Sequence, residues 1–169
     1  MKRVWLVIVT ALLLSGCATS SPSNSEYSSD DIAFAEQMIP HHEQAIEMSE
    51  IALLNTTNPD VLQLAQEIKD AQAPEIELMK SWTGVKVSTH AGHMMDGMLS
   101  EKELSEIRDA KGKAFDVLFL QGMIKHHEGA IEMAKEVLED GKDTAVKALA
   151  TAVATAQDSE ILEMKELLG

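Results

Sequence analysis

The sequence predicts an all-α protein, a four-helix bundle made of two duplicated helical hairpins. Apolar residues recur at spacings of three and four along four long segments, as they do in amphipathic helices. The two halves align without a gap at an offset of 85 positions. Ten of seventeen residues are identical between 34–50 and 119–135, and nine of twenty-two between 61–82 and 146–167. Two hairpins with apolar stripes bury them most completely against each other, which favours the bundle.

The first hairpin is expected over about residues 30–83. Asp30 and Asp31 open its first helix, because acidic side chains favour the positive end of a helix. Its second helix should begin after Asn58, a good N-cap, with Pro59 at the first helical position.

A linker rich in Met and His is expected over residues 84–100. Ser100 and Glu103 form a capping-box pattern that starts a short helix after this linker. The second hairpin is expected over about 115–168, with Asp143 as the N-cap of its second helix.

Residues 1–16 are predicted to be a secretory signal rather than part of the fold, because two basic residues precede an apolar run that is too short to span a bilayer. The sequence Leu-Ser-Gly before Cys17 resembles a bacterial lipoprotein box. This resemblance implies cleavage before Cys17 and lipid chains on that residue. The alternative is a plain signal peptide with an accidental Cys. Residues 17–29 are then a lipid-anchored flexible tether, and 30–169 the bundle.

Charge and cysteine content narrow the function. Without the two basic residues of the leader, 12 basic and 28 acidic side chains give a formal charge of −16. This excludes nucleic acid as a partner, and it suits either cation attraction or mere solubility. Cys17 is the only cysteine, so a soft metal site would have to use Met and His. This fits the oxidising, extracytoplasmic face of a bacterial envelope, and Ala18 favours the outer membrane if the host is Gram-negative.

A Met-Ile-x-His-His-Glu stretch at 38–43 recurs at 123–128. On a helix, its Met lies three and four positions before the two histidines, so either pair can meet one ion. Adjacent histidines are about 100° apart around the axis, so one of each pair should face inward and the other a neighbouring helix or the rim. The predicted inner metal ligands are Met38, His41, His42, Met48, Met123, His126, His127 and Met133.

The linker offers a second candidate site. A short segment with both imidazoles and thioethers suits capture of Cu(I) in a site of low coordination number. The alternative is a mobile connection between the repeats. Gln72 and Gln157 lie in the core stripes and are expected to hydrogen-bond the histidines. The candidate linker ligands are His90, His93, Met94, Met95 and Met98.

The ligand types favour copper. Di-iron bundles build their sites from Glu-x-x-His on paired helices. Here the same spacing is Met-x-x-His, at Met38 and again at Met123, so a thioether stands where the hard carboxylate would be. This change disfavours iron and favours Cu(I), with Ag(I) as its mimic. The alternative is that the methionines fill the core and the histidines are structural.

Two longer patterns resemble the DUF305 family, a ferritin-like helical group of secreted bacterial proteins. They are F-x3-M-I-x-H-H-x2-A-I-x-M over residues 34–48 and F-D-x2-F-L-x2-M-I-x-H-H-x-G-A-I-x-M-A over 115–134. The resemblance implies a ferritin-like bundle and, more loosely, copper binding, since some members are similar to a periplasmic copper-binding protein linked to copper resistance. It implies no known reaction. Gly129 stands where the first repeat has Gln44, so the halves should pack differently around their sites.

The leading hypothesis is therefore an envelope lipoprotein for copper sequestration, relay or tolerance, with no catalytic residue. Its expected partners are the metal ion, the membrane through the anchor at Cys17, and a copper-handling protein. Two alternatives remain. One is a ferritin-like metal oxidase, and the other is a non-catalytic envelope interaction module with structural histidines.

Overall fold

Five helices make up the structure, a computed structural model that describes residues 27–86 and 95–169. The predicted signal peptide, most of the tether with Cys17, and the linker residues His90, His93 and Met94 lie outside the described residues. No strand occurs in the two described ranges. The helices are α1 (Ser29–Asn55), α2 (Pro59–Lys80), α3 (Glu101–Asp109), α4 (Gly112–Asp140) and α5 (Thr144–Leu168).

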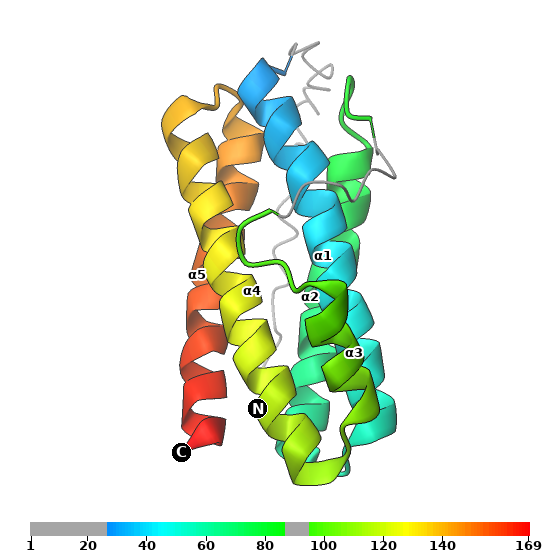
Figure 1. Ribbon diagram of the computed structural model, residues 1–169. Coiled ribbons are helices and arrows are strands. Elements are labelled where there is room, and N and C mark those ends of the chain that lie inside the picture. Colours follow the sequence, from blue (N-terminus) through cyan, green and yellow to red (C-terminus); the bar gives the residue numbers. More distant parts are fainter. Residues whose placement is uncertain (1–26, 87–94) are drawn as a thin grey trace, which may run out of the picture.

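The four long helices form a bundle of two hairpins, which confirms the predicted fold class (Figure 1). The pair α1 and α2 forms one hairpin, and α4 and α5 form the other. The hairpins meet mainly through α1 and α4, which run antiparallel, whereas α2 and α5 barely touch. The short helix α3 packs on α1 and α4 near one end of the bundle.

Side-chain caps begin four of the helices. The predicted caps are confirmed: Asn58 accepts from a backbone amide of α2, Asp143 from two of α5, and Ser100 forms a capping box with Glu103. The cap of α1 is Ser28, which the sequence interpretation missed. Each cap stabilises its helix by roughly 1 kcal/mol, because it satisfies amides that have no partner within the helix.

A side chain of each repeat also forms hydrogen bonds with the hairpin turn of the other repeat. The buried carboxylate of Asp31 on α1 accepts hydrogen bonds from the backbone amides of Lys142 (3.0 Å) and Asp143 (3.2 Å) in the α4–α5 turn. At the equivalent place in the other half, Asp116 accepts from the side-chain amide of Asn58 at 3.2 Å. These contacts fix the two hairpins in register, so the midpoints of α1 and α4 lie at the same level.

The apolar core is divided into two clusters, one towards each end of the bundle. On α1, Met38 belongs to one cluster and Ala45 to the other, and the two histidines lie between them. A polar layer therefore crosses the middle of the core. The six methionines that are buried among the described residues divide evenly, with Met38, Met79 and Met133 in one cluster and Met48, Met123 and Met164 in the other.

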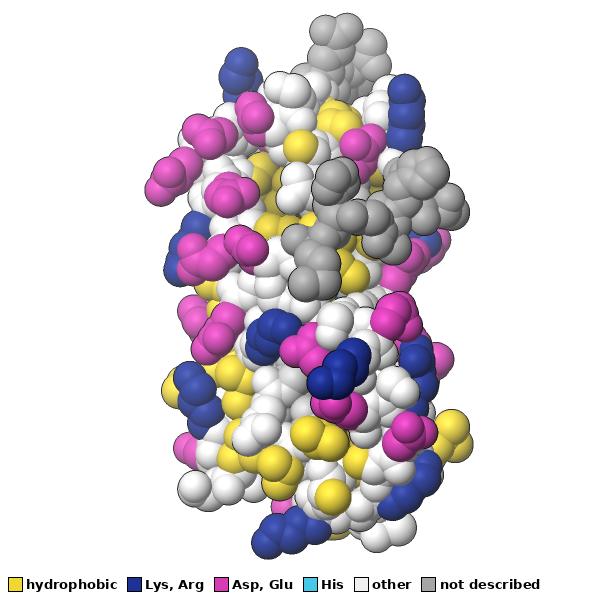
Figure 2. All heavy atoms as spheres, viewed as in Figure 1, with side chains coloured by type: hydrophobic (Ala, Val, Ile, Leu, Met, Phe, Trp, Pro, Cys, Tyr) yellow, Lys and Arg dark blue, Asp and Glu magenta, His cyan; other side chains and the backbone are white. Residues whose placement is uncertain are grey.

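The surface carries acidic, basic and apolar side chains (Figure 2). Figure 2 shows acidic side chains gathered over the upper parts of α4 and α5 in that view, in keeping with the acidic composition. None of the described helices is long and apolar enough to cross a membrane.

Candidate metal centre

The two His-His pairs meet at the centre of the bundle. His41 and His42 lie midway along α1, and His126 and His127 midway along α4. All four side chains are fully buried, with 0% of their surface exposed. Four buried imidazoles form an unusual core, because each ring carries two polar nitrogens that need partners.

His41 and His126 contact each other across the two repeats. Their ring centroids lie 3.7 Å apart, with 38° between the ring planes. They occupy equivalent positions in the repeats, so the approximate two-fold axis of the bundle passes between them. Burial, reinforced by the neighbouring histidines, lowers the pKa of His41 to about 3 and that of His126 well below its ordinary value. Both rings are therefore neutral at neutral pH, and their lone pairs are free for a metal ion.

His42 and His127 each pair with a carboxylate of their own hairpin. The Nε2 atom of His42 lies 2.9 Å from Oε2 of Glu75 on α2, and that of His127 lies 2.6 Å from Oε2 of Glu160 on α5. The glutamates are 22% and 18% exposed, so they connect the buried rings to the edge of the bundle. The two histidines of a pair thus have different partners, one in the other repeat and one in its own.

These glutamates correct one prediction. We expected Gln72 and Gln157 to hydrogen-bond the histidines, but they do not. The Nε2 and Oε1 atoms of Gln72 and the Oε1 atom of Gln157 have no hydrogen-bond partner in the described structure. The carboxylate three positions later takes that place in both repeats, at Glu75 and Glu160. The sequence carried a signal for this, because Gln-x-x-Glu-Ile-x-x-Met occurs in both halves. The rotation of α2 about its axis decides whether Gln72 or Glu75 faces the histidine, and the sequence pattern does not determine that rotation.

Five ring nitrogens in the histidine layer have no hydrogen-bond partner in the described structure. A buried polar atom without a partner costs about 1–3 kcal/mol, so such atoms are rare in folded proteins. Their concentration in one layer is an arrangement that an ion would satisfy. The atoms are Nδ1 of His41, His42 and His127, and both Nδ1 and Nε2 of His126.

The predicted methionine ligands lie on both sides of this layer. Met38 and Met133 belong to the apolar cluster on one side, and Met48 and Met123 to the cluster on the other. All four are buried, with at most 7% of their surface exposed. The eight predicted inner residues therefore do not all converge on one point, and each side of the layer has its own thioethers.

One segment of the linker covers this layer. Residues 95–100, here called the strap, pass between α1 and α4 (Figure 1). The backbone carbonyl oxygen of Asp96 lies 3.2 Å from Nε2 of His41. Gly129 of α4 makes this approach possible, because a Cβ atom there would lie 2.0 Å from the same oxygen. Gly97 turns the strap with φ +83°, in the left-handed region that favours glycine.

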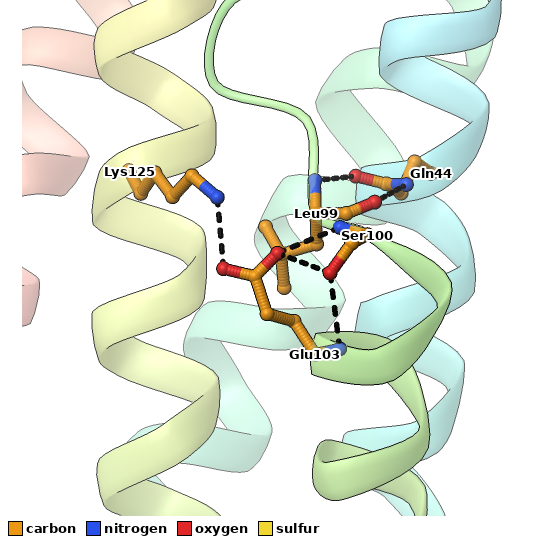
Figure 3. Close-up of polar contacts among 5 residues, drawn as sticks. All are labelled: Gln44, Leu99, Ser100, Glu103 and Lys125. Carbon is orange, nitrogen blue, oxygen red and sulfur yellow. Dashed lines mark hydrogen bonds and ion pairs between the residues drawn. The ribbon is translucent and has the colours of Figure 1, made fainter. Parts of the chain in front are cut away.

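Gln44 fastens the strap to α1. Its side-chain amide donates to the carbonyl of Leu99 (3.0 Å), and its side-chain oxygen accepts from the amide of Leu99 (2.7 Å), as Figure 3 shows. Gln44 and Gly129 are equivalent positions, one per repeat. One of the positions where the repeats differ in sequence is thus the place where a single strap breaks their symmetry.

Helix α3 anchors the other end of the strap. Glu103 accepts from the amide and hydroxyl of Ser100, both at 2.7 Å, and from Lys125 of α4 at 2.8 Å (Figure 3). The hydrogen bond from Lys125, followed by those from Ser100, lowers the pKa of Glu103 to about 2. The strap is thereby tied to both helices that carry the histidines.

Two of the predicted linker ligands line a groove beside the strap. Met95 and Met98 are half-buried and, together with Pro40, Glu43 and Glu47, line a groove of about 340 Å³. The groove therefore brings two thioethers next to two carboxylates on the outer side of α1.

The family described as "Domain of unknown function (DUF305)" matches residues 31–168. The chain belongs to this family. A putative secreted DUF305 protein from Streptomyces coelicolor is 34% identical, with a TM-score of 0.77 over 83% of this chain and 92% of that one. The solved structure of CopM in its Cu(II)-bound form is 30% identical, with a TM-score of 0.71 over 81% and 94%.

CopM has also been solved in Cu(I)-bound and Ag-bound forms. Among curated proteins, the uncharacterised protein L153 of Acanthamoeba polyphaga mimivirus is 43% identical over 53 residues. That match covers 31% of this DUF305 chain and 35% of the viral protein, so the chain spans about a third of that relative.

The donor atoms of this DUF305 chain suit a soft ion. Neutral imidazoles and thioethers bind Cu(I) and Ag(I) in preference to hard cations. Within residues 27–86 and 95–169, no three His, Cys, Asp or Glu side chains are arranged to hold one ion.

Proposed function

We propose that this DUF305 protein binds Cu(I) at its histidine layer, as cargo to be sequestered or passed on. The observation that carries the proposal is the group of five unpartnered ring nitrogens on four fully buried histidines. Buried thioethers lie on either side of them. Support comes from CopM, a relative of the same fold that has been crystallised with copper and silver ions.

The ligands would come from the two repeats together. His41 and His126 are the central pair, because their rings are already in contact. The proposed thioether ligands are Met38 and Met133 on one side of the layer and Met48 and Met123 on the other. His42 and His127 complete the inner set.

The groove beside the strap is proposed as the place where the ion first binds. Met95 and Met98 would supply thioethers, and Glu43 and Glu47 would attract the cation. The other candidate ligands of the linker, His90, His93 and Met94, would extend this outer site. The ion would pass from the groove to the histidine layer when the strap, whose Asp96 carbonyl covers His41, moves aside.

The proposed setting is the extracytoplasmic face of a bacterial envelope. The chain would be anchored through lipid on Cys17 and held off the membrane by residues 17–29. A copper-handling protein would deliver or accept the ion, and the acidic surface leaves no basic footprint for nucleic acid.

An anaerobic Cu(I) titration against a chromophoric chelator tests the function. The domain should withhold Cu(I) from the chelator, and a His41→Ala/His126→Ala double variant should lose at least tenfold in affinity. Gln37→Ala is the matched control, since it changes an exposed residue of the same helix. A domain that cannot compete at all, or a double variant with unaltered affinity, contradicts the proposal. Stoichiometric iron with oxygen-dependent turnover would support the ferritin-like oxidase instead.

A further inference from the structure

We infer that Glu75 and Glu160 are positioning residues, which fix the tautomers of His42 and His127 and make Nδ1 the atom that binds the ion. The inference rests on the proposed function and specifies which ring atom performs it. Neither glutamate lies in the repeated Met-Ile-x-His-His-Glu stretch, and each comes from the second helix of its hairpin.

The chemistry of the pair determines the tautomer. A carboxylate can only accept a hydrogen bond, so the Nε2 atom that faces it must carry the proton. In a neutral imidazole the other nitrogen then has a free lone pair, and here that atom is Nδ1. The Nδ1 atoms of His42 and His127 are buried and have no partner in the described structure. A proton on either Nδ1 would leave a buried donor without an acceptor, which the structure gives no means to satisfy.

A purely structural pair would not leave this atom open. Buried histidines that serve packing alone satisfy both nitrogens, since each unpaired one costs free energy. Here only one nitrogen of each ring is satisfied, and the same one in both repeats. The partner lies 33 positions away in each hairpin, at 2.9 Å from His42 and at 2.6 Å from His127.

The strap selects the same tautomer in a third ring by different means. The carbonyl of Asp96 is also an acceptor only, and it faces Nε2 of His41. The Nδ1 atom of His41 is again buried and without a partner. Three histidines of the layer thus carry their proton on Nε2, although two acceptors are carboxylates and one is a backbone carbonyl.

The carboxylates also offset the charge of the cargo. A cation inside the bundle loses its hydration, and nearby negative charge compensates part of that loss. Glu75 and Glu160 are close enough to act through the imidazoles, yet remain 22% and 18% exposed. Partners of this kind hold a metal-binding imidazole in orientation and raise its basicity, and removing them typically lowers affinity by about 10–100-fold.

Long-range proton–nitrogen NMR of the ¹⁵N-labelled, metal-free protein tests the tautomers directly. The rings of His42 and His127 should carry the proton on Nε2, with Nδ1 bare. Addition of Ag(I) should then shift the Nδ1 resonances and leave Nε2 protonated. Rings protonated on Nδ1 in the metal-free protein would overturn the inference, because no lone pair would then face the layer.

Glu75→Gln and Glu160→Gln provide the second arm. A carboxamide can donate to Nε2, so each variant should shift the tautomer of its own histidine towards Nδ1–H and lower Ag(I) affinity by about 10–100-fold. Glu77→Gln is the matched control, an exposed glutamate on the same helix that should change neither quantity. Variants with unchanged tautomers and affinity would overturn the inference while Cu(I) binding stands. A wild-type chain with Nε2–H tautomers that binds neither Ag(I) nor Cu(I) would overturn the proposed function, and the ligand role with it.

Discussion

His41 and His126 show what a single buried residue contributes in this protein. Two imidazoles whose ring centroids lie 3.7 Å apart contribute little to stability, because apolar side chains of similar size would pack there without unpaired nitrogens. Their presence in an otherwise apolar core is therefore better explained by binding than by packing. Neutral rings are the form that a soft cation requires.

The metal-free protein should lose stability as the pH falls below 6.5. Burial lowers the pKa of His41 to about 3, and it lowers the pKa of His126 well below the ordinary value of 6.5. The folded state therefore binds fewer protons than the unfolded state, and the loss proceeds as the pH falls from 6.5 towards 3. The slope should be about 1 kcal/mol per pH unit for each such histidine. Urea unfolding between pH 4 and 8 measures it, and parallel curves for the wild type and a His41→Gln/His126→Gln variant would contradict it.

At the scale of elements, the strap depends on one glycine. Gly129→Ala places a Cβ atom 2.0 Å from the carbonyl oxygen of Asp96. The atoms nearest to this Cβ belong to the backbone of Asp96 and Gly97, which cannot move aside as a side chain can. The strap should lift from α4, with a loss of about 1–3 kcal/mol of stability. Hydrogen exchange at the amide of Leu99, which Gln44 protects, should accelerate. Glu128→Ala is the control on the same helix, since its side chain is exposed.

The anchor of the strap should respond to acid in a different range. Hydrogen bonds from Lys125 and Ser100 lower the pKa of Glu103 from 4.5 to about 2. Its contribution is therefore fully present above pH 4.5 and is lost as the pH falls through 2. The protection factors of the first amides of α3, which are corrected for the intrinsic pH dependence of exchange, should fall across that window in the wild type, and Glu103→Gln should abolish the change. Protection factors that do not vary with pH in the wild type would contradict this role of Glu103, and Glu106→Gln on the exposed face of α3 serves as the control.

Helices and most caps were predictable from sequence because their causes are local. Periodicity, Asn58, Ser100 and Asp143 act within one or two turns, and the structure places each where expected. Contacts between elements were not predictable in the same way. No pattern in the sequence indicates that Asp96 contacts His41, since that contact depends on the path of the linker across two helices.

The candidate site was predictable in its residues more than in its contacts. The repeat predicts that the histidines are site residues, and in the structure they meet in one layer. The pairing with Glu75 rather than Gln72 depends on helix rotation, which a one-dimensional pattern does not determine. Gly129 departs from the repeat, but the need for glycine comes from the close approach of the Asp96 backbone, which only the fold reveals.

At the scale of the whole molecule, the duplication determines that the histidine layer lies at the centre of the bundle. Two copies of one hairpin, joined by their α1 and α4 faces, bring equivalent residues together on the two-fold axis. A single strap then makes the two halves inequivalent, so that the ring of His41 is covered and that of His126 has no hydrogen-bond partner among the described residues. Symmetry thus brings the proposed ligands together, and the strap makes their surroundings different.

The register that aligns the halves should depend on Asp31. Burial acts to raise the pKa of this carboxyl, but hydrogen bonds from Ser28, Lys142 and Asp143 outweigh it and lower the pKa below 3.8. Asp31→Ala should cost roughly 1.5–3 kcal/mol, because it removes hydrogen bonds to a charged acceptor. Urea denaturation measures the loss, with the exposed neighbour Asp30→Ala as control. The difference between the wild type and Asp31→Ala should shrink as the pH falls below 3.8, since the carboxylate is then protonated. A constant difference would contradict this role.

Anomalous diffraction from crystals of the Ag(I)-loaded protein shows directly whether the histidine layer binds a soft ion. We expect a silver peak inside the bundle, within bonding distance of a ring nitrogen of His41 or His126 and of at least one methionine sulfur. Silver found only at surface carboxylates, with the four histidines unliganded, would contradict it.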